Sequence, residues 1–122
     1  MWQLSTNLKP QIEKTLSRWH PPDPGWVKVN SDAAFQAQGC VGATACVVRD
    51  HRGEFRAARA CWCDRALNVR MMEATACRDG LLLARQVGVQ KAVLETDCLE
   101  LVNLWKQKDS QRSIVDPVLK EI

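Results

Sequence analysis

Three consecutive stretches in the first half of the chain have strand-like patterns, and the first alternates apolar and polar residues. In residues 26–32 (WVKVNSD), valines alternate with lysine, asparagine and aspartate, as a half-buried strand requires. A glycine-containing turn leads to a second strand at 43–49, and the DHRG that follows is typical of a hairpin turn. In the third strand, 54–63, Phe55, Ala57 and Cys61 lie on one side. The pattern predicts three consecutive antiparallel strands.

A helical period replaces the alternation after the third predicted strand. Met72 and Ala76 recur on one face of a helix that we expect to end at Gly88. The short apolar run KAVLET (91–96) then favours a strand, and Asp97 opens the helical pattern CLELVNLWKQ. The elements follow in the order βββαβα, which predicts an α/β protein with a mixed sheet.

Both ends of the chain carry helical patterns with proline nearby. Residues 4–19 are amphipathic and predict a helical segment, and HPPDPG (20–25) excludes helix by its prolines and glycine. We therefore divide the chain into a helical segment with a proline-rich lead-in (1–25) and one domain (26–122). The tail SIVDPVLKEI (113–122) predicts a third helical segment, kinked near its proline.

Composition narrows the class of protein without naming a function. The chain has 122 residues, of which 46% are hydrophobic and 25% charged, the balance of one soluble domain. It shows neither a signal-peptide core nor an apolar run that would cross a bilayer, so we expect an intracellular protein, nuclear or cytoplasmic. The six cysteines contain no C-x-x-C pair, and five fall in predicted elements, which favours reduced, packed thiols.

Three acids stand where a predicted strand or helix begins or ends. Asp32 closes the first strand, Glu73 lies in the first turns of the first helix, and Asp97 follows the strand at 91–96. Taken one at a time, they are equally well explained as a surface charge, a helix-dipole partner and an N-cap. Converging from two strands and a helix, they would form an all-oxygen pocket suited to Mg²⁺ or Mn²⁺ and to chemistry on phosphodiesters.

A family resemblance is carried by four segments: WHPPDPGWVKVNSDAAF, GATACVVRDHRGEF, MMEATACRDGLLLARQVGV and VLETDCLELV. Together they resemble the type 1 ribonuclease H domain, above all its plant, retroelement-like form. The resemblance implies a ribonuclease H-like fold with a five-stranded mixed sheet. It also implies that Asp32, Glu73 and Asp97 are catalytic metal ligands, with Asp32 bridging two Mg²⁺ ions, and that the RNA strand of RNA–DNA hybrids is hydrolysed.

The chain departs from the family pattern at its C-terminal end. The family continues into a fifth strand and a last helix, which carry a histidine and a fourth acid, and this sequence ends before either. We therefore expect a domain that lacks its final strand and helix. In such a domain the strand at 91–96 would be a free sheet edge, open to self-association or to a partner.

Candidate contacts with nucleic acid lie near the predicted acids, where amide, main-chain or guanidinium groups would meet phosphate. They are Lys28, Asn30, Ala33 and Arg70. Trp62 and Trp105 are assigned to packing, the usual role of tryptophan in a strand or on a helix face. Two alternatives stay open besides the nuclease: a non-catalytic ribonuclease H-like module that binds nucleic acid or a protein partner, and a retroelement remnant without its own function.

Overall fold

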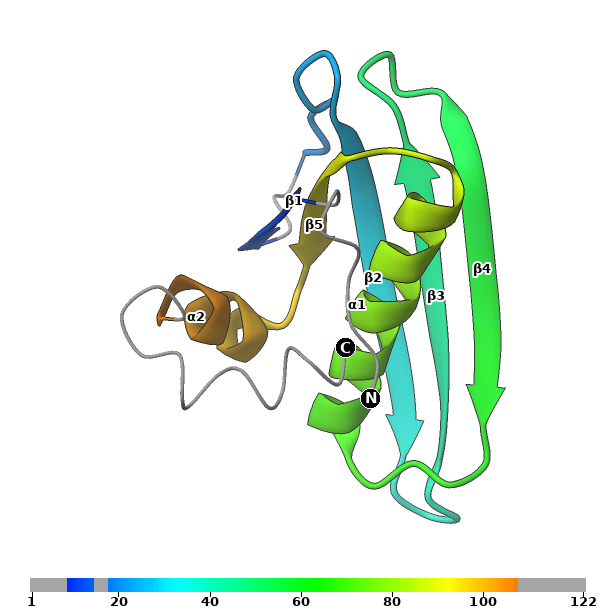
Figure 1. Cartoon of the computed structure of the whole chain (residues 1–122). Coiled ribbons are helices and arrows are strands. Elements are labelled where there is room, and N and C mark those ends of the chain that lie inside the picture. Colours follow the sequence, from blue (N-terminus) through cyan, green and yellow to red (C-terminus); the bar gives the residue numbers. More distant parts are fainter. Residues whose placement is uncertain (1–8, 15–17, 108–122) are drawn as a thin grey trace.

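The computed structural model describes residues 9–14 and 18–107. They form one five-stranded sheet with two helices (Figure 1). In chain order the elements are β1 (Lys9–Lys14), β2 (Val27–Gln36), β3 (Val41–Arg49), β4 (Phe55–Cys63), α1 (Val69–Gln86), β5 (Lys91–Thr96) and α2 (Leu99–Gln107). None of the described helices is long and apolar enough to span a membrane.

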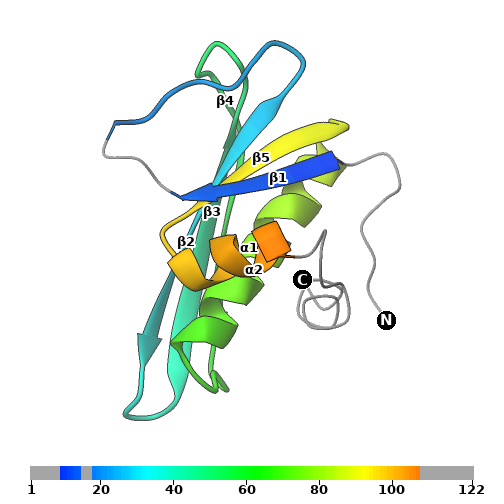
Figure 2. The ribbon, with the colours of Figure 1, turned by 90° about the vertical axis from the view of Figure 1, so that its left-hand side faces the viewer.

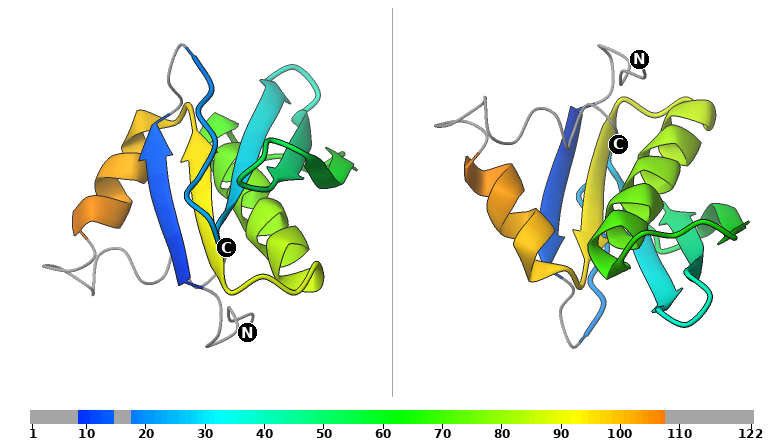
Figure 3. Two further views of the ribbon diagram at one scale, coloured as in Figure 1. Left: turned by 90° about the horizontal axis from the view of Figure 1, so that it is seen from above. Right: turned by 90° about the horizontal axis from the view of Figure 1, so that it is seen from below.

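The strands lie in the order β1-β5-β2-β3-β4. β2, β3 and β4 pair antiparallel, whereas β5 runs parallel to β2 on one side and to β1 on the other. The predicted α/β class, the mixed sheet and the βββαβα order of the elements from β2 onward are therefore confirmed. α1 lies across β2 and β3, and α2 lies beside β1 (Figure 3).

β1 corrects two predictions. Within the segment expected to be helical (4–19), the described residues 9–14 form a strand that pairs with β5 along its whole length. β5 is therefore an inner strand and not the free edge that we expected (Figure 2). The physical reason is tertiary: β5 offers a row of unpaired backbone groups, and pairing with them outweighs a weak local preference for helix. The rest of the segment and the tail 113–122 lie outside the described residues.

The core lies between the sheet and α1. Val29, Val48, Leu81 and Leu94 are all within 2% of complete burial. A glycine brings the helix unusually close to the sheet, because a Cβ atom on Gly80 would lie only 2.6 Å from Val29 Cγ1. This close approach fixes the height of α1 above β2, and thus the position of every side chain on the helix.

The proline-rich lead-in folds back onto the sheet. Trp19 Nε1 donates a hydrogen bond to Asn30 Oδ1 at 3.0 Å, and Lys28 Nζ lies 5.5 Å from the centre of the Trp19 ring. Arg49 of the neighbouring strand is 6.0 Å from the same ring. The lead-in is thus attached to β2 through Trp19, which bonds to Asn30, and through the carbonyl oxygen of His20, which accepts a bond from Lys28.

Candidate metal centre

The first two acids lie where β2 and β5 separate. The two strands pair from Val27↔Ala92 to Asn30↔Glu95, and the pairing stops there. Asp32 lies two residues after Asn30, and Asp97 lies two residues after Glu95. β2 continues beside β3, whereas β5 ends at Thr96 and the chain turns toward α2. We call the place where β2 and β5 separate the fork. It puts Asp32 and Asp97 at the same end of neighbouring strands.

The third acid reaches this fork from α1. The helix begins after Asn68, whose side chain accepts a hydrogen bond from the Met71 amide at 2.7 Å. Glu73 follows within two turns and is half-buried. Its Oε2 is buried and has no hydrogen-bond partner among the described residues. A carboxylate oxygen in that state is available to a ligand.

Electrostatics connect the three acids. The pKa of Glu73 is raised above its ordinary value, first by burial and then by the negative charges of Asp32 and Asp97. The structure therefore brings the three predicted residues into one electrostatic neighbourhood, although they come from three separate elements. Mutual repulsion of this kind is relieved by protonation of one acid or by a cation.

The donor set fits a hard divalent ion in type, because all three groups are carboxylates. Asp32 and Asp97 are exposed, so their side chains are free to turn toward an ion. Asp32 Oδ1 accepts a hydrogen bond from the Ala33 amide at 2.9 Å, which leaves its second oxygen unengaged by that bond. Within residues 9–14 and 18–107, no three His, Cys, Asp or Glu side chains are already placed around a single point for an ion.

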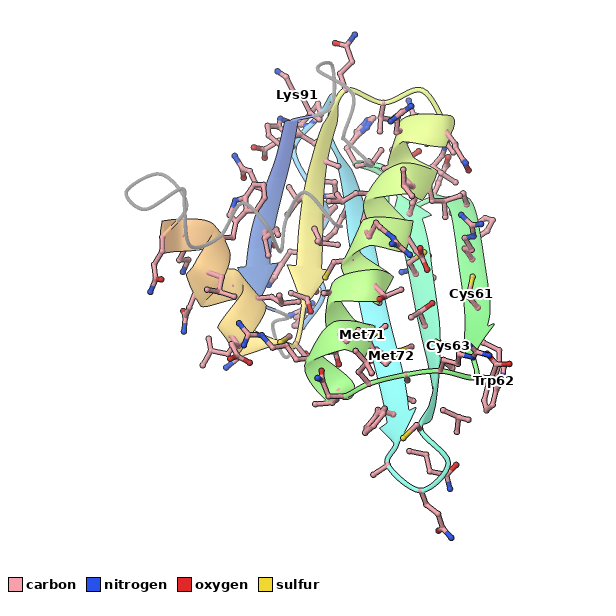
Figure 4. The ribbon with its side chains drawn as sticks, turned by 60° about the horizontal axis from the view of Figure 1, so that its bottom comes forward. Cys61, Trp62, Cys63, Met71, Met72 and Lys91 are labelled. Atoms are coloured by element: carbon pink, nitrogen blue, oxygen red, sulfur yellow. The ribbon has the colours of Figure 1, made fainter. Side chains whose placement is uncertain are left out.

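A hollow of about 420 Å³ opens on the sheet beside Asp32. Its lining is mostly small and comprises Asp32, Ala33, Ala34, Ala43, Thr44, Ala45, Ala60, Cys61 and Trp62. Trp62 is 69% exposed at the end of β4, which corrects its assignment to packing (Figure 4). The sequence held a signal for this, since Trp62 continues the alternation of Ala58 and Ala60, both of them exposed. Trp105, by contrast, packs against the core as predicted.

The structure also corrects Lys28 as a candidate contact with nucleic acid. The Lys28 side chain is only 5% exposed, and its Nζ lies 3.1 Å from Glu95 Oε2 and 3.2 Å from Glu13 Oε1. The same ammonium donates a hydrogen bond to the His20 carbonyl oxygen at 2.7 Å. Alternation placed Lys28 on the polar face of β2, but β1 and the lead-in cover that part of the face.

Asn30 is engaged in the same network. Its Nδ2 donates to Glu95 Oε1 at 3.0 Å, and its Oδ1 accepts from Trp19 Nε1. The side-chain amide is therefore committed to internal partners, which corrects its assignment to nucleic-acid contact. The sequence could not reveal this, because Glu95 reads as a polar residue near the end of an apolar strand.

Ala33 and Arg70 remain beside the acids. Ala33 is half-buried and lines the hollow next to Asp32. Arg70 is exposed, and its Nη1 lies 3.1 Å from Glu100 Oε1, so this ion pair connects the first turns of α1 and α2. An exposed pair of this kind contributes little to stability and exchanges partners readily.

Comparison with known proteins identifies the family and the fold. A family model described as Reverse transcriptase-like matches residues 30–122. The chain belongs to this family. A crystal structure of RNase H1 from the halophilic archaeon Halobacterium salinarum NRC-1 is similar, with a TM-score of 0.60 and 20% sequence identity over 77% of this chain and 76% of that one. No curated protein sequence matches the chain.

This reverse transcriptase-like chain thus has the ribonuclease H fold, and the expected resemblance to a type 1 ribonuclease H domain is confirmed. The family match begins at Asn30, in β2. β1 precedes the matched region, yet it fills the sheet position beside β5. The strand that completes the described sheet therefore comes from sequence outside the family match.

Proposed function

We propose that this chain is a divalent-metal-dependent endonuclease that hydrolyses the RNA strand of RNA–DNA hybrids. The observation that carries the proposal is the placement of three acids: Asp32 and Asp97 lie at the same end of neighbouring strands, and Glu73 on α1 has a buried, unpartnered Oε2 and feels the charges of both. The family and the ribonuclease H fold support a nuclease of this general kind. The acids support a metal-dependent reaction, because three carboxylates that repel one another form a natural cation site.

In this proposal Asp32, Glu73 and Asp97 hold and orient the metal, Mg²⁺ or alternatively Mn²⁺. A metal bound there would supply a water molecule of lowered pKa and charge stabilisation for the leaving oxygen. Glu73 supplies the buried, unpartnered Oε2 from the helix side. Asp32 supplies a carboxylate whose Oδ1 accepts a hydrogen bond from the Ala33 amide and whose second oxygen is not engaged by that bond. Asp97 closes the site from the end of β5.

The hybrid would approach from the exposed side of the acids. Arg70 stands at the start of α1 and would exchange Glu100 for a phosphate oxygen. Ala33 would present its backbone beside Asp32 and leave room for a sugar–phosphate chain. Lys28 and Asn30 take no part, because the buried network of β1, β2 and β5 occupies them.

The proposal is tested by cleavage of a duplex with a labelled RNA strand and an unlabelled DNA strand, in Mg²⁺. We expect the chain to release products with a 3′-hydroxyl and a 5′-phosphate, and Asp32→Asn to lose at least about 100-fold in rate, since charge stabilisation by a bound metal is lost. Asp64→Asn, at an exposed acid in the β4–α1 loop, is the matched control and keeps the wild-type rate. Equal rates for the chain and for Asp32→Asn contradict the proposal.

The second candidate is a non-catalytic module of the same fold that binds nucleic acid or a protein partner. One observation favours it: the described acids are not yet gathered around a single point for an ion. Under this reading the chain binds the hybrid without turnover, and Asp97→Asn binds it as well as the unmodified chain does. A gel-shift titration of both proteins, run beside the cleavage assay, separates the two functions.

A further inference from the structure

A buried polar cluster lies in the interior next to the three acids. It consists of Ser31, Cys77 and Thr96, whose exposed fractions are 8%, 1% and 0%. Ser31 Oγ lies 3.6 Å from Cys77 Sγ, and the Thr96 side chain also hydrogen-bonds to this thiol. The cysteine thus joins three elements at one point, because Ser31 belongs to β2, Cys77 to α1 and Thr96 to β5.

The cluster follows the acids along the sequence. Ser31 directly precedes Asp32, and Thr96 directly precedes Asp97. Cys77 lies four residues after Glu73, so the two share one face of α1. Every member of the cluster is therefore one residue, or one helical turn, from a different acid.

Thr96 also holds the backbone around the third acid. Its Oγ1 accepts a hydrogen bond from the Cys98 amide at 3.2 Å, across Asp97. The turn that carries Asp97 is thereby tied to the same side chain that contacts Cys77. Movement of the thiol would be transmitted to the ends of both strands.

The thiol suits this position because it stays neutral. Burial, as the largest effect, raises the pKa of Cys77 to about 11, and the charge of Glu73 acts in the same direction. A neutral thiol adds no negative charge beside three carboxylates and still forms hydrogen bonds. Cys77 is too deeply buried to contact a substrate.

We propose that Cys77 is a positioning residue whose thiol, held between Ser31 and Thr96, sets the spacing of the backbone segments that carry Asp32, Glu73 and Asp97. This inference rests on the proposed function, since spacing matters only if the acids bind a metal together. Residues that orient metal ligands without touching the metal typically change its affinity by about 10- to 100-fold.

The test measures Mn²⁺ affinity of the full chain by calorimetry. Cys46→Ala is the matched control, because Cys46 is a buried cysteine in β3 that also packs against α1 but lies outside the cluster. We expect Cys77→Ala to bind Mn²⁺ about 10- to 100-fold more weakly, Cys77→Ser to restore most of the affinity, and Cys46→Ala to bind as the wild type does. If Cys77→Ala does not fold, Thr96→Val is the substitute test. It replaces the hydroxyl with a methyl group, and it should also weaken Mn²⁺ binding.

A second readout does not depend on metal. Amide hydrogen exchange of Asp32 and Cys98 should accelerate in Cys77→Ala, and remain as in the wild type in Cys46→Ala. If the wild type binds Mn²⁺ and both alanine variants bind it as tightly as the wild type does, the positioning role of Cys77 is overturned. If the wild type binds no Mn²⁺, the proposed function fails, while unchanged exchange in Cys77→Ala separately overturns the structural link.

Discussion

Lys28 and Glu95 form a buried ion pair that joins the two central parallel strands, with Nζ and Oε2 3.1 Å apart and the side chains 5% and 2% exposed. The second oxygen of Glu95 accepts a hydrogen bond from Asn30, and Glu13 reaches the same ammonium from β1. Three strands are thus connected through one lysine. Because a buried charge without a partner is costly, this network holds the strands close to the fork at which the acids lie.

Removing the lysine charge should destabilise the whole domain. In Lys28→Met, Glu95 stays buried without its counter-ion, so we expect the free energy of unfolding to fall by about 3–5 kcal/mol. Urea denaturation followed by circular dichroism measures the change. Arg56→Met is the control, because the Arg56 side chain is 47% exposed and 3.9 Å from Asp50, and should cost less than about 1 kcal/mol. Similar losses in the two variants would contradict the role given to Lys28.

The attachment of β1 can be tested at its buried side chain. Ile12 is 7% exposed and belongs to the core, so Ile12→Asp would bring an unpaired carboxylate into apolar surroundings and release the strand. The edge of β5 would then be open to another chain, and we expect association that increases with protein concentration. Size-exclusion chromatography with light scattering detects it. Gln11→Asp, at the exposed neighbouring position, should behave as the wild type does.

The sequence predicted β2, β3 and β4 because alternation along a strand and the turns between strands are local signals, and it predicted α1 from a period that the helix itself creates. Asp32 and Asp97 became candidates for the same reason, since one ends the alternating run 26–32 and the other follows the strand at 91–96, although β2 continues past Asp32 to Gln36. β1 was not predicted, because KPQIEK carries only one strong β-former. Its conformation depends on pairing with β5, which lies far along the chain.

The errors at the candidate site have two physical origins. Lys28 and Asn30 alternate onto a polar face, and a sequence cannot show that Glu95 and Trp19 will occupy that face. The prediction for Trp62 was wrong in the opposite direction: it was assigned to packing, because a large aromatic side chain is usually buried, and it is exposed. For Lys28 and Asn30, partners from other elements decided the outcome, whereas for Trp62 the alternation along β4 held the signal.

The close contact of α1 with β2 should not tolerate a methyl group. Gly80→Ala gains about 1 kcal/mol of helix propensity, but its Cβ would lie 2.6 Å from Val29 Cγ1 and 3.4 Å from Cys46 Cβ. Overpacking costs typically 1–3 kcal/mol, so we expect a net loss of stability of up to about 2 kcal/mol. Urea denaturation of Gly80→Ala, Val29→Ala and the double variant checks the cause. The double variant should lose less than the sum of the two single losses, and an additive result would contradict the steric explanation.

The raised pKa of Glu73 predicts a dependence of stability on pH. Between the ordinary pKa of 4.5 and the higher folded value, the folded state binds more protons than the unfolded state. The contribution of Glu73 to the free energy of unfolding is therefore fully favourable below its ordinary pKa and is lost as the pH rises through its pKa in the folded state. In metal-free buffer Glu73→Gln should be more stable than the wild type at pH 7, and this advantage should disappear near pH 4. Glu54→Gln, at an exposed turn residue, is the control. An advantage that is independent of pH would contradict the electrostatic cause.

Metal should reverse the order of stability between the wild type and an acid variant. In EDTA, Asp32→Asn removes one charge that acts on Glu73, so this variant should unfold at a higher temperature than the wild type. Excess Mg²⁺ stabilises only a protein that binds it, by about 2.7 kcal/mol at a free concentration of 100 times Kd. The wild type should therefore unfold at the higher temperature in Mg²⁺, with Asp64→Asn following the wild type in both buffers. Differential scanning calorimetry measures all three proteins in both buffers, and an Asp32→Asn variant that gains as much from Mg²⁺ as the wild type does would place the ion elsewhere.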